Sequence, residues 1–413
     1  MSGAATDLGF TKALQQMRAA ITPHGFVASN TDLHNYKRIW GRDGVIVSIA
    51  ALQTDEADLH LAARNTLQTL HDHQGPHGEI PSNVDMEKGQ VSYGGTAGRV
   101  DANLWFVIGC HRYWQKTQDE EFLQKFLPSI RKVEFLLGAW EFNTKGLLYV
   151  PETGDWADEY ISHGYVLYDQ LLYYRALQDM ARMYEAAGED GAHALQERAS
   201  VLRDLIQANY WFYDCDPDTA HAYHPNMFKR GCDLAGEKDS YWMSFFSPTG
   251  YGYRFDAMAN VLASFFGIAS DEQRNHVDQY IDEKCINPDL KILPAFSPVI
   301  EPLDTDWQRL QSTFSNTFKN RPYEYHNGGL WPLINGFYVA DLAARGNMDR
   351  ARDFLSAIDI ANEMDTESEG WGFYEFIHGQ TLKPGGARHQ AWSASAAVMG
   401  HLAMIGTPPL PIE

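Results

Sequence analysis

The amino-acid sequence predicts an all-α fold, a single (α/α)6 barrel over residues 1–413 with long functional loops on one face. Apolar residues return at three- and four-residue spacing in about twelve segments, which are arranged roughly in pairs. Strand-like alternation is scarce. No motif repeats at a fixed period of roughly 30–45 residues, which disfavours the competing architecture, an α-solenoid.

The expected helices follow one another along the whole chain, and each is identified by the periodicity of its apolar residues. They lie near residues 7–20, 43–53, 56–73, 102–117, 119–140, 167–187, 190–210, 255–268, 270–284, 330–345, 348–363 and 388–405. The longest stretches between them, about 211–253 and 286–329, are rich in aromatic residues, Pro, Gly and Asn. Long loops in a compact domain are usually functional, so we expect binding or catalysis there.

The composition limits the classes of partner. The chain has 33 basic and 54 acidic residues, a formal net charge of −21. Such a surface repels phosphate backbones and anionic headgroups, which excludes nucleic acids and membrane surfaces. A small neutral saccharide is compatible with such an acidic surface. The negative charge is equally well explained by solubility alone. The sequence allows a homo-oligomer without specifying one.

The cysteines and the N-terminal residues predict a cytoplasmic protein. Cys110, Cys215, Cys232 and Cys285 form no CxxC pair and have no short metal-ligand spacing. We therefore expect free buried thiols in a reducing compartment, and no metal or organic cofactor. The chain starts without a basic region followed by an apolar run, and no apolar stretch approaches the roughly 20 residues that span a bilayer.

Two motifs place Arg and Asp at the start of a helix. The first, Arg38 to Gly44, contains Trp40, Arg42 and Asp43. A guanidinium beside a carboxylate can make paired hydrogen bonds to adjacent sugar hydroxyls, and a tryptophan offers an apolar face to a sugar ring. The second, Gly98 to Phe106, has Asp101 before a Trp-Phe pair. Helix capping by Asp43 and Asp101 is an equally good interpretation of both motifs.

The third motif, Pro151 to Tyr160, carries four acids within eight residues, interleaved with aromatic residues. It contains Asp155, Trp156 and Asp158. A carboxylate packed against indole is desolvated, so its pKa rises toward that of a general acid. A solvated acidic loop is the alternative, but such loops seldom carry Trp and Tyr at this density.

The fourth motif, Tyr323 to Pro332, leads into a helix and contains His326, Asn327 and Trp331. Its consecutive glycines allow close backbone approach, while the other side chains supply hydrogen bonds and a stacking face. An ordinary helix-entry turn, with proline in the first turn, explains the same residues without a function.

The fifth motif places Glu375 between aromatic residues, upstream of Arg388 and Trp392. A glutamate with aromatic residues on both sides is unusual for a solvent-facing position. A buried structural ion pair between Glu375 and Arg388 is the alternative to a functional role.

Together the motifs describe a sugar pocket with two carboxylates, one for general acid and one for general base catalysis. Asp158 and Glu375 are the two candidates, and Asp155 is the alternative acid. Acyl transfer, phosphoryl transfer and zinc hydrolysis lack their signatures, since the chain has no G-x-S-x-G elbow, no P-loop and no H-E-x-x-H.

Several of these motifs resemble those of the alkaline/neutral invertases. The similar segments are G-R-V-D-A-N-L-W-F, the acidic loop ending at Asp158, R-F-D-A-M-A-N-V-L-A from Arg254 and Y-H-N-G-G-L-W-P from Tyr325. Their order covers residues 36 to 393. The resemblance implies an (α/α)6 barrel of the six-hairpin glycosidase type that hydrolyses sucrose with inversion.

The resemblance also implies roles for the two carboxylates. The family's general acid lies eleven residues before an acidic helix residue, as Asp158 does before Asp169. Its general base is a Glu upstream of a helix start like Ala391-Trp392-Ser393, which matches Glu375. Arg42, Asp43, Asp101, Asp155, His326, Asn327 and Arg388 would then contact the sugar, with Trp40, Trp156, Trp331 and Trp392 as its apolar walls.

Two other activities remain open. G-R-D followed by V-D-A-x-L-W-F is at least as similar to the amylo-1,6-glucosidases of glycogen debranching, and Glu159 and Tyr160 stand where invertases usually have basic residues. Sugar 2-epimerases and isomerases also use helical barrels and work through paired histidines, which His326, His378 and His389 could supply. A catalytically silent sugar-binding barrel is the third alternative. We expect hydrolysis of an α-glucosidic bond in a short soluble sugar, with sucrose first.

Overall fold

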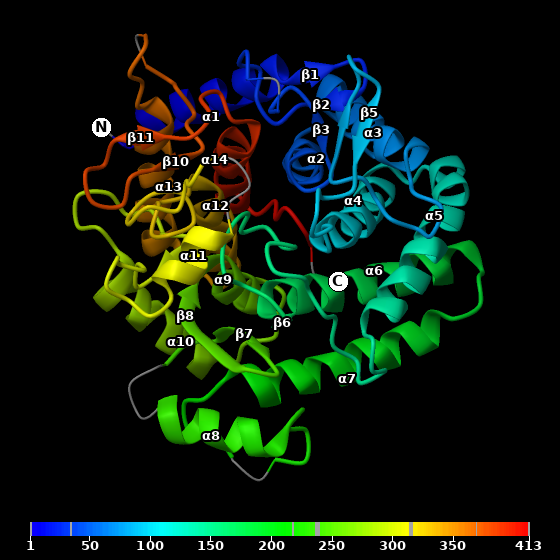
Figure 1. Ribbon diagram of the computed structural model, residues 1–413. Coiled ribbons are helices and arrows are strands. Elements are labelled where there is room, and N and C mark those ends of the chain that lie inside the picture. The colour runs from blue at the N-terminus through cyan, green and yellow to red at the C-terminus, as the bar shows by residue number, and fades with distance from the viewer. Residues whose placement is uncertain are drawn as a thin grey trace.

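Helices form the framework of the computed structural model, which describes residues 2–33, 35–216, 219–235, 240–313, 317–368 and 370–411. All twelve segments that were expected to be helical contain a helix (Figure 1). The helix over residues 167–187 matches the predicted range. In the segment expected over 270–284, the α-helix ends at Tyr280 and a π-helix follows from Ile281 to Cys285. The twelve helices are α1 (Ser2–Ala19), α2 (Asp43–Gln53), α3 (Ala57–Asp72), α4 (Asp101–Thr117), α5 (Glu120–Trp140), α6 (Leu167–Ala187), α7 (Ala192–Tyr210), α9 (Ala257–Phe265), α10 (Asp271–Tyr280), α12 (Pro332–Ala344), α13 (Met348–Glu363) and α14 (Ala391–Met404).

Part of this set forms a closed cycle of neighbours. In sequence order α2, α4, α6, α9, α12 and α14 each contact the next, and α14 contacts α2. The first and last parts of the chain therefore lie side by side (Figure 1). Every residue of α2 and of α9 is buried, because both segments are apolar on all sides and have no polar face to turn to water.

A second set of helices packs outside this cycle. Helices α3, α5, α7 and α13 each contact the member of the cycle that precedes them in sequence, and α1 packs against α14. The sequence explains the position of α5, since its buried residues recur at helical spacing and its other face is polar or charged. Burial of one apolar stripe against the inner helix stabilises each such pair.

The two long stretches predicted as loops contain further elements. A four-stranded antiparallel sheet, in the order β6-β7-β8-β9, and two short helices lie there or next to them. The all-α prediction was incomplete here, because β7 is buried at all five positions and so shows no alternation of polar and apolar residues. These elements are β6 (Tyr165–Val166), α8 (Pro225–Ala235), β7 (Met243–Ser247), β8 (Gly250–Asp256), β9 (Phe296–Ser297) and α11 (Trp307–Ser312).

Three small antiparallel sheets hold other loops together through backbone hydrogen bonds. One joins β3, which lies within the first motif, to the hairpin of β4 and β5, and another lies next to Glu375. Their strands are β1 (Ile21–Thr22), β2 (Gly25–Phe26), β3 (Ile39–Trp40), β4 (Asn83–Asp85), β5 (Gln90–Ser92), β10 (Phe376–Ile377) and β11 (Pro384–Gly385).

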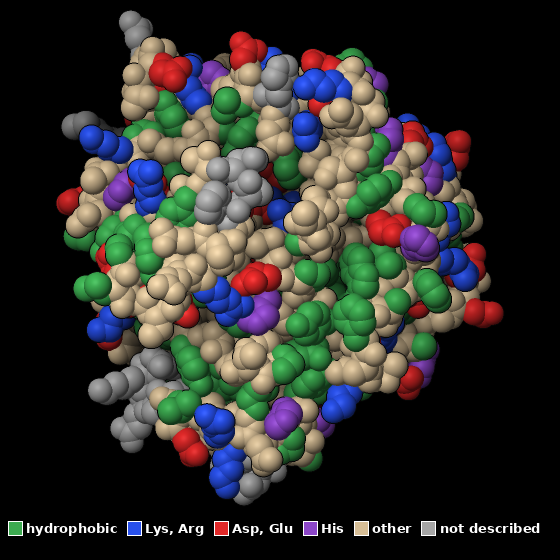
Figure 2. Space-filling model, in the orientation of Figure 1, with side chains coloured by type: hydrophobic (Ala, Val, Ile, Leu, Met, Phe, Trp, Pro, Cys, Tyr) green, Lys and Arg blue, Asp and Glu red, His purple; other side chains and the backbone are tan. Residues whose placement is uncertain are grey.

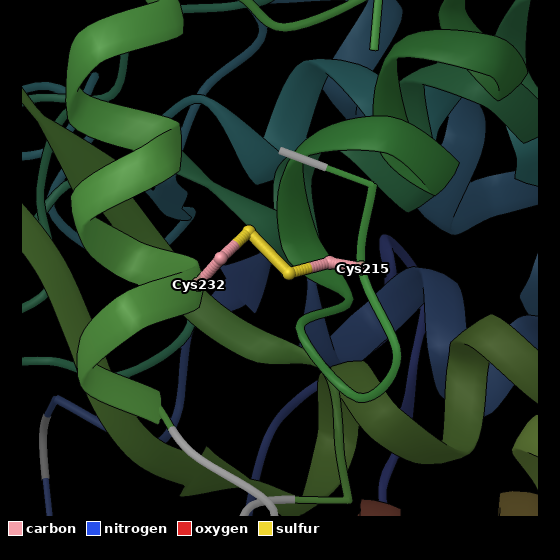
Figure 3. The surroundings of a disulfide bond; sticks show 2 residues. All are labelled: Cys215 and Cys232. Carbon is pink, nitrogen blue, oxygen red and sulfur yellow. A yellow bond between two sulfur atoms is a disulfide. The ribbon is translucent and has the colours of Figure 1, made fainter. Parts of the chain in front are cut away.

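The cysteines differ in part from expectation. Cys110 and Cys285 are free and buried, as expected. Cys215 and Cys232, however, form a disulfide that ties α8 to the segment after α7 (Figure 3). Their Cα atoms lie 6.4 Å apart, within the range that a disulfide bridges. The expectation of four free thiols was wrong because α8, which brings Cys232 back toward Cys215, was not predicted.

The surface carries charges of both signs despite the net charge of −21. On the face in Figure 2, Lys and Arg side chains are interspersed with Asp and Glu, and hydrophobic side chains lie between them. In the part of the chain that the structure describes, no helix combines the length and the hydrophobicity needed to cross a membrane.

Candidate active site

The two predicted carboxylates, Asp158 and Glu375, line one cavity although more than half of the chain separates them. Asp158 lies in the loop between α5 and β6, and Glu375 directly precedes β10. Four of the five sequence motifs meet at this cavity. Its remaining lining residues are Asn35, Tyr36, Trp40, Arg42, Asp43, Trp156, Lys319, Tyr325, His326 and Trp392.

Arg42 connects three of the acids. Its Nη1 lies 3.2 Å from Asp101 Oδ2, its Nε 3.4 Å from Asp43 Oδ2, and its Nη2 3.8 Å from Asp158 Oδ2. The guanidinium also lies over the Trp392 ring, 5.6 Å from the centroid. Asp43 and Asp101 are the first residues of α2 and α4, and neither helix has a side-chain cap. The capping interpretation was therefore wrong, and both carboxylates are held by Arg42 instead.

Asp158 is ionised in this environment. Burial raises its pKa, but the Arg99 and Arg42 guanidinium groups outweigh burial and lower the pKa below its usual 3.8. Arg99 Nη2 lies 2.7 Å from Asp158 Oδ1. The prediction that packing against Trp156 would raise this pKa was wrong. Desolvation is present, but two cations from other segments reverse its effect.

The pKa of Glu375 is shifted in the opposite direction to that of Asp158. Burial raises its pKa to about 7, although hydrogen bonds from the Ala387 backbone and Tyr36 oppose this shift. The Tyr36 hydroxyl lies 3.2 Å from Oε1 and 3.0 Å from Oε2, and Ala387 N donates to Oε2 at 3.1 Å. Gly386 makes this contact possible, since a Cβ there would overlap Oε2. Glu375 can therefore exchange a proton near neutral pH.

Aromatic rings and one histidine form a wall of the cavity. Trp156 meets His326 edge-on at 4.8 Å, and His326 stacks on Trp331 at 4.8 Å with 13° between the rings. Trp331 itself does not line the cavity but supports the wall from behind and packs edge-on against Trp392. The predicted apolar walls are thus assembled, with Trp331 in the second layer.

His326 is neutral and has free hydrogen-bonding capacity. Burial lowers its pKa to about 3, so the ring is uncharged at ordinary pH. Both ring nitrogens are buried without a hydrogen-bond partner. A neutral imidazole has one donor and one acceptor, which suits the hydroxyls of a sugar. His378 and His389 do not line the cavity, so the paired-histidine site of the epimerase alternative is not assembled there.

Five predicted site residues do not line the cavity. Asp101 and Trp331 contact its lining residues Arg42 and His326, whereas Asn327, Arg388 and Asp155 are engaged elsewhere or buried. Asn327 binds the backbone of Ile300 through both ends of its amide, at 2.7 and 2.9 Å, and so joins two loops. Arg388 pairs with Asp365 instead of Glu375, so the structural ion pair considered for Glu375 does not form. Asp155 lies in the same loop as Asp158 and is fully buried.

Asp155 belongs to a group of buried, electrostatically interacting carboxyls, with Asp101, Asp169 and Asp256. Burial and the neighbouring Asp256 raise the pKa of Asp155 well above its usual value, and burial and Asp155 do the same to Asp169. The eleven-residue spacing from Asp158 therefore ends at a buried acid in α6, not at a second wall of the cavity.

Sequence reasoning missed Tyr36, Arg99 and Lys319. Arg99 lies in the second motif, two residues before Asp101, and Tyr36 precedes the first motif by two residues, so proximity to a predicted site residue was the available signal for both. Lys319 has no such signal. It is exposed, and its Nζ lies 5.2 Å from the centroid of the Tyr325 ring.

A family model described as alkaline and neutral invertase matches residues 18–405. Among curated proteins, alkaline/neutral invertase C, mitochondrial, from Arabidopsis thaliana is 24% identical over 426 residues, which cover 90% of this chain and 62% of the relative. This chain thus spans less than two thirds of that relative.

Solved glycosidases share the fold. A mannosylglycerate hydrolase from Thermus thermophilus, in complex with Tris and D-glycerate, aligns with a TM-score of 0.68 and 14% identity over 94% of this chain and 99% of the other. A bacterial glucoamylase complexed with acarbose aligns with a TM-score of 0.66 and 16% identity over 97% of this chain and 56% of the other.

Proposed function

Since the chain belongs to the alkaline and neutral invertase family and is a glycoside hydrolase, we propose that it hydrolyses an α-glucosidic bond in a short soluble sugar, with inversion and with sucrose as first substrate. The observation that carries this proposal is the meeting of Asp158 and Glu375 at one cavity with Arg42 and a neutral His326. Most glycoside hydrolases use two carboxyl groups, one on each side of the scissile bond, as their catalytic residues.

In the proposed mechanism, Asp158 donates a proton to the glycosidic oxygen and Glu375 accepts one from the attacking water. The water attacks the anomeric carbon on the face opposite the leaving group. Inversion needs room for this water, so we expect the two carboxyl groups about 6.5–9.5 Å apart. Tyr36 and Ala387 N would hold the Glu375 carboxylate in position through the bonds described above.

Substrate binding has to redistribute one proton between the two carboxyls. Without substrate, the lowered pKa of Asp158 and the pKa of about 7 for Glu375 place the proton on Glu375 at slightly acidic pH. A sugar packed against Asp158 desolvates it further and raises its pKa, whereas a water that donates to Glu375 stabilises the carboxylate. Both changes move the proton toward the acid.

We propose that Arg42, Asp43 and His326 bind the glucosyl hydroxyls between Trp40, Trp156 and Trp392. Asn327 and Arg388 are not included, because both are engaged elsewhere. The cavity measures about 40 Å³, well below the roughly 300–1,000 Å³ typical of small-molecule sites. Binding therefore requires side chains at its mouth, such as the exposed Lys319, to move aside.

The remaining elements of the proposal concern architecture and location. We infer that the closed cycle of helices with its outer partners is an (α/α)6 barrel forming one domain. We also propose that the protein acts in the cytoplasm on a neutral substrate without a cofactor. Fractionation of cells of the source organism, with activity measured in each fraction, tests the location.

Incubation of the protein with sucrose, isomaltose and free hexoses tests the reaction. Sucrose cleavage with β-glucose as the first product, seen by proton NMR within minutes, is the expected result. An initial α-anomer would mean retention, faster cleavage of isomaltose would favour a debranching activity, and interconversion of free hexoses would mean an epimerase. The Glu375→Gln variant, prepared in the same way, controls for contaminating glycosidases.

A further inference from the structure

A second and larger cavity is lined in part by residues that follow Asp158 in the same loop. It measures about 710 Å³, within the roughly 300–1,000 Å³ of small-molecule sites. Residues 160–163 of that loop, the β7–β8 hairpin and Arg309 of α11 line it. None of the residues that line the active-site cavity lines this one.

The lining is unusually aromatic for a surface cavity. Aromatic rings bind sugars through the apolar faces of the pyranose, while tyrosine hydroxyls add polar contacts. The aromatic residues are Tyr160, Tyr241, Phe245, Tyr251, Tyr253 and Tyr280.

Of the three Lys and Arg side chains that line the cavity, the two arginines have carboxylate partners, and Lys284 is exposed to solvent. Arg254 pairs with Asp306 at 3.2 Å, and Arg309 pairs with Glu152 at 2.8 Å. Both arginines are thus neutralised by carboxylates, and an anionic ligand would have to displace one of them. Arginines that are already paired with carboxylates, together with the aromatic walls, favour a neutral polyhydroxylated ligand.

Two of the lining tyrosines lack partners. The hydroxyl groups of Tyr160 and Tyr251 are buried and make no hydrogen bond. A buried hydroxyl without a partner costs free energy, so a ligand that supplies one gains affinity. Tyr160 also stacks on Phe296 at 4.2 Å, and Phe296 stacks on Trp156 at 6.2 Å, which links this cavity to the active-site wall.

We propose that this cavity binds a second neutral saccharide, outside the active site. The proposal rests on the chain being a glycoside hydrolase that meets soluble sugars, and it does not depend on sucrose being the substrate. A saccharide held there contacts the loop that carries Asp158 through residues that do not line the active-site cavity.

Calorimetric titration of maltose into the Glu375→Gln variant tests the proposal, with two binding events expected. Adding Tyr160→Phe and Tyr251→Phe should weaken one event, by roughly two- to tenfold per hydroxyl. The melting temperature should stay the same or rise, because the lost hydroxyls have no partner. Tyr93→Phe is the matched control, since its hydroxyl donates to His73 O outside both cavities, and both events should persist.

Each other outcome is decisive. A single event weakened by the tyrosine pair supports the second site and counts against sugar binding at the active site. No binding, or a single event that the tyrosine pair leaves unchanged and Trp40→Ala abolishes, overturns the second site. A lower melting temperature of the tyrosine pair would make the hydroxyls structural and also overturns it. Tighter binding of glucose 6-phosphate than of maltose would show that the cavity prefers an anionic ligand, and would overturn the proposal of a neutral one.

Discussion

Replacing Tyr36 with phenylalanine separates the two carboxylate roles. The Tyr36 hydroxyl donates to Glu375 at 3.0 and 3.2 Å and stabilises its ionised form. Hydrogen bonds to charged groups contribute about 1.5–3 kcal/mol, and 1.36 kcal/mol corresponds to one pKa unit. Loss of this bond should therefore raise the pKa of Glu375 from about 7 to about 8–9.

The consequence for activity depends on which carboxyl is the acid. The profile of kcat/KM against pH reports the free enzyme, and its alkaline limb follows the higher of the two pKa values. With a pKa of about 7 for Glu375 and one below 3.8 for Asp158, fewer than about one singly protonated molecule in a thousand carries the proton on Asp158. If Asp158 is the acid, this minor form is the active one. A Glu375 pKa that is about one to two units higher makes the minor form about ten to a hundred times rarer. Tyr36→Phe should therefore lower the plateau of kcat/KM about ten- to hundredfold and move the alkaline limb to higher pH.

The assay is the initial rate of sucrose hydrolysis from pH 4 to pH 10, for the wild type and the Tyr36→Phe variant. An alkaline limb that moves to higher pH while the plateau of kcat/KM stays constant would make Glu375 the acid and refute the proposed roles. An unmoved limb would show that Glu375 does not control activity at all. Tyr93→Phe removes a hydroxyl outside the cavity and should leave both features unchanged.

Three further predictions concern the same site. Asp158→Asn and Glu375→Gln should each lower kcat by at least about a hundredfold with the melting curve intact, whereas near-normal activity of Asp158→Asn beside an inactive Asp155→Asn would move the acid to Asp155. On α-glucosyl fluoride, whose leaving group needs no proton, Asp158→Asn should keep most of its rate and Glu375→Gln should not; the reverse pattern would exchange the roles. Gly386→Ala places a methyl group against Glu375 Oε2 at a φ of +72°, so kcat should fall more than KM changes, and an unaltered kcat would show that this carboxylate need not be held in place.

The sequence predicted most of the helical framework and the meeting of its motifs. Helices such as α6 were located to the residue because their apolar residues repeat over many turns. The strand β7 and the helix α8 were missed for a physical reason as well. A strand buried on both faces has no period of two, and α8 starts at Pro225 and contains Gly231, residues that are typical of loops.

The side chains of the site were predicted better than their chemistry. Asp158 and Trp156 are two residues apart, so the sequence shows the desolvation of this carboxylate directly. Arg99, which decides its charge, lies in another loop, and Arg42 approaches from the start of a third segment. Desolvation is a local effect that neighbours in the chain reveal, whereas Coulomb interactions depend on distances that only the fold sets. Glu375 keeps the raised pKa that burial gives it because Ala387 N, the charge of Lys319 and the Tyr36 hydroxyl together do not outweigh burial. A motif therefore identifies which groups can carry protons, and the contacts between motifs decide where the protons are.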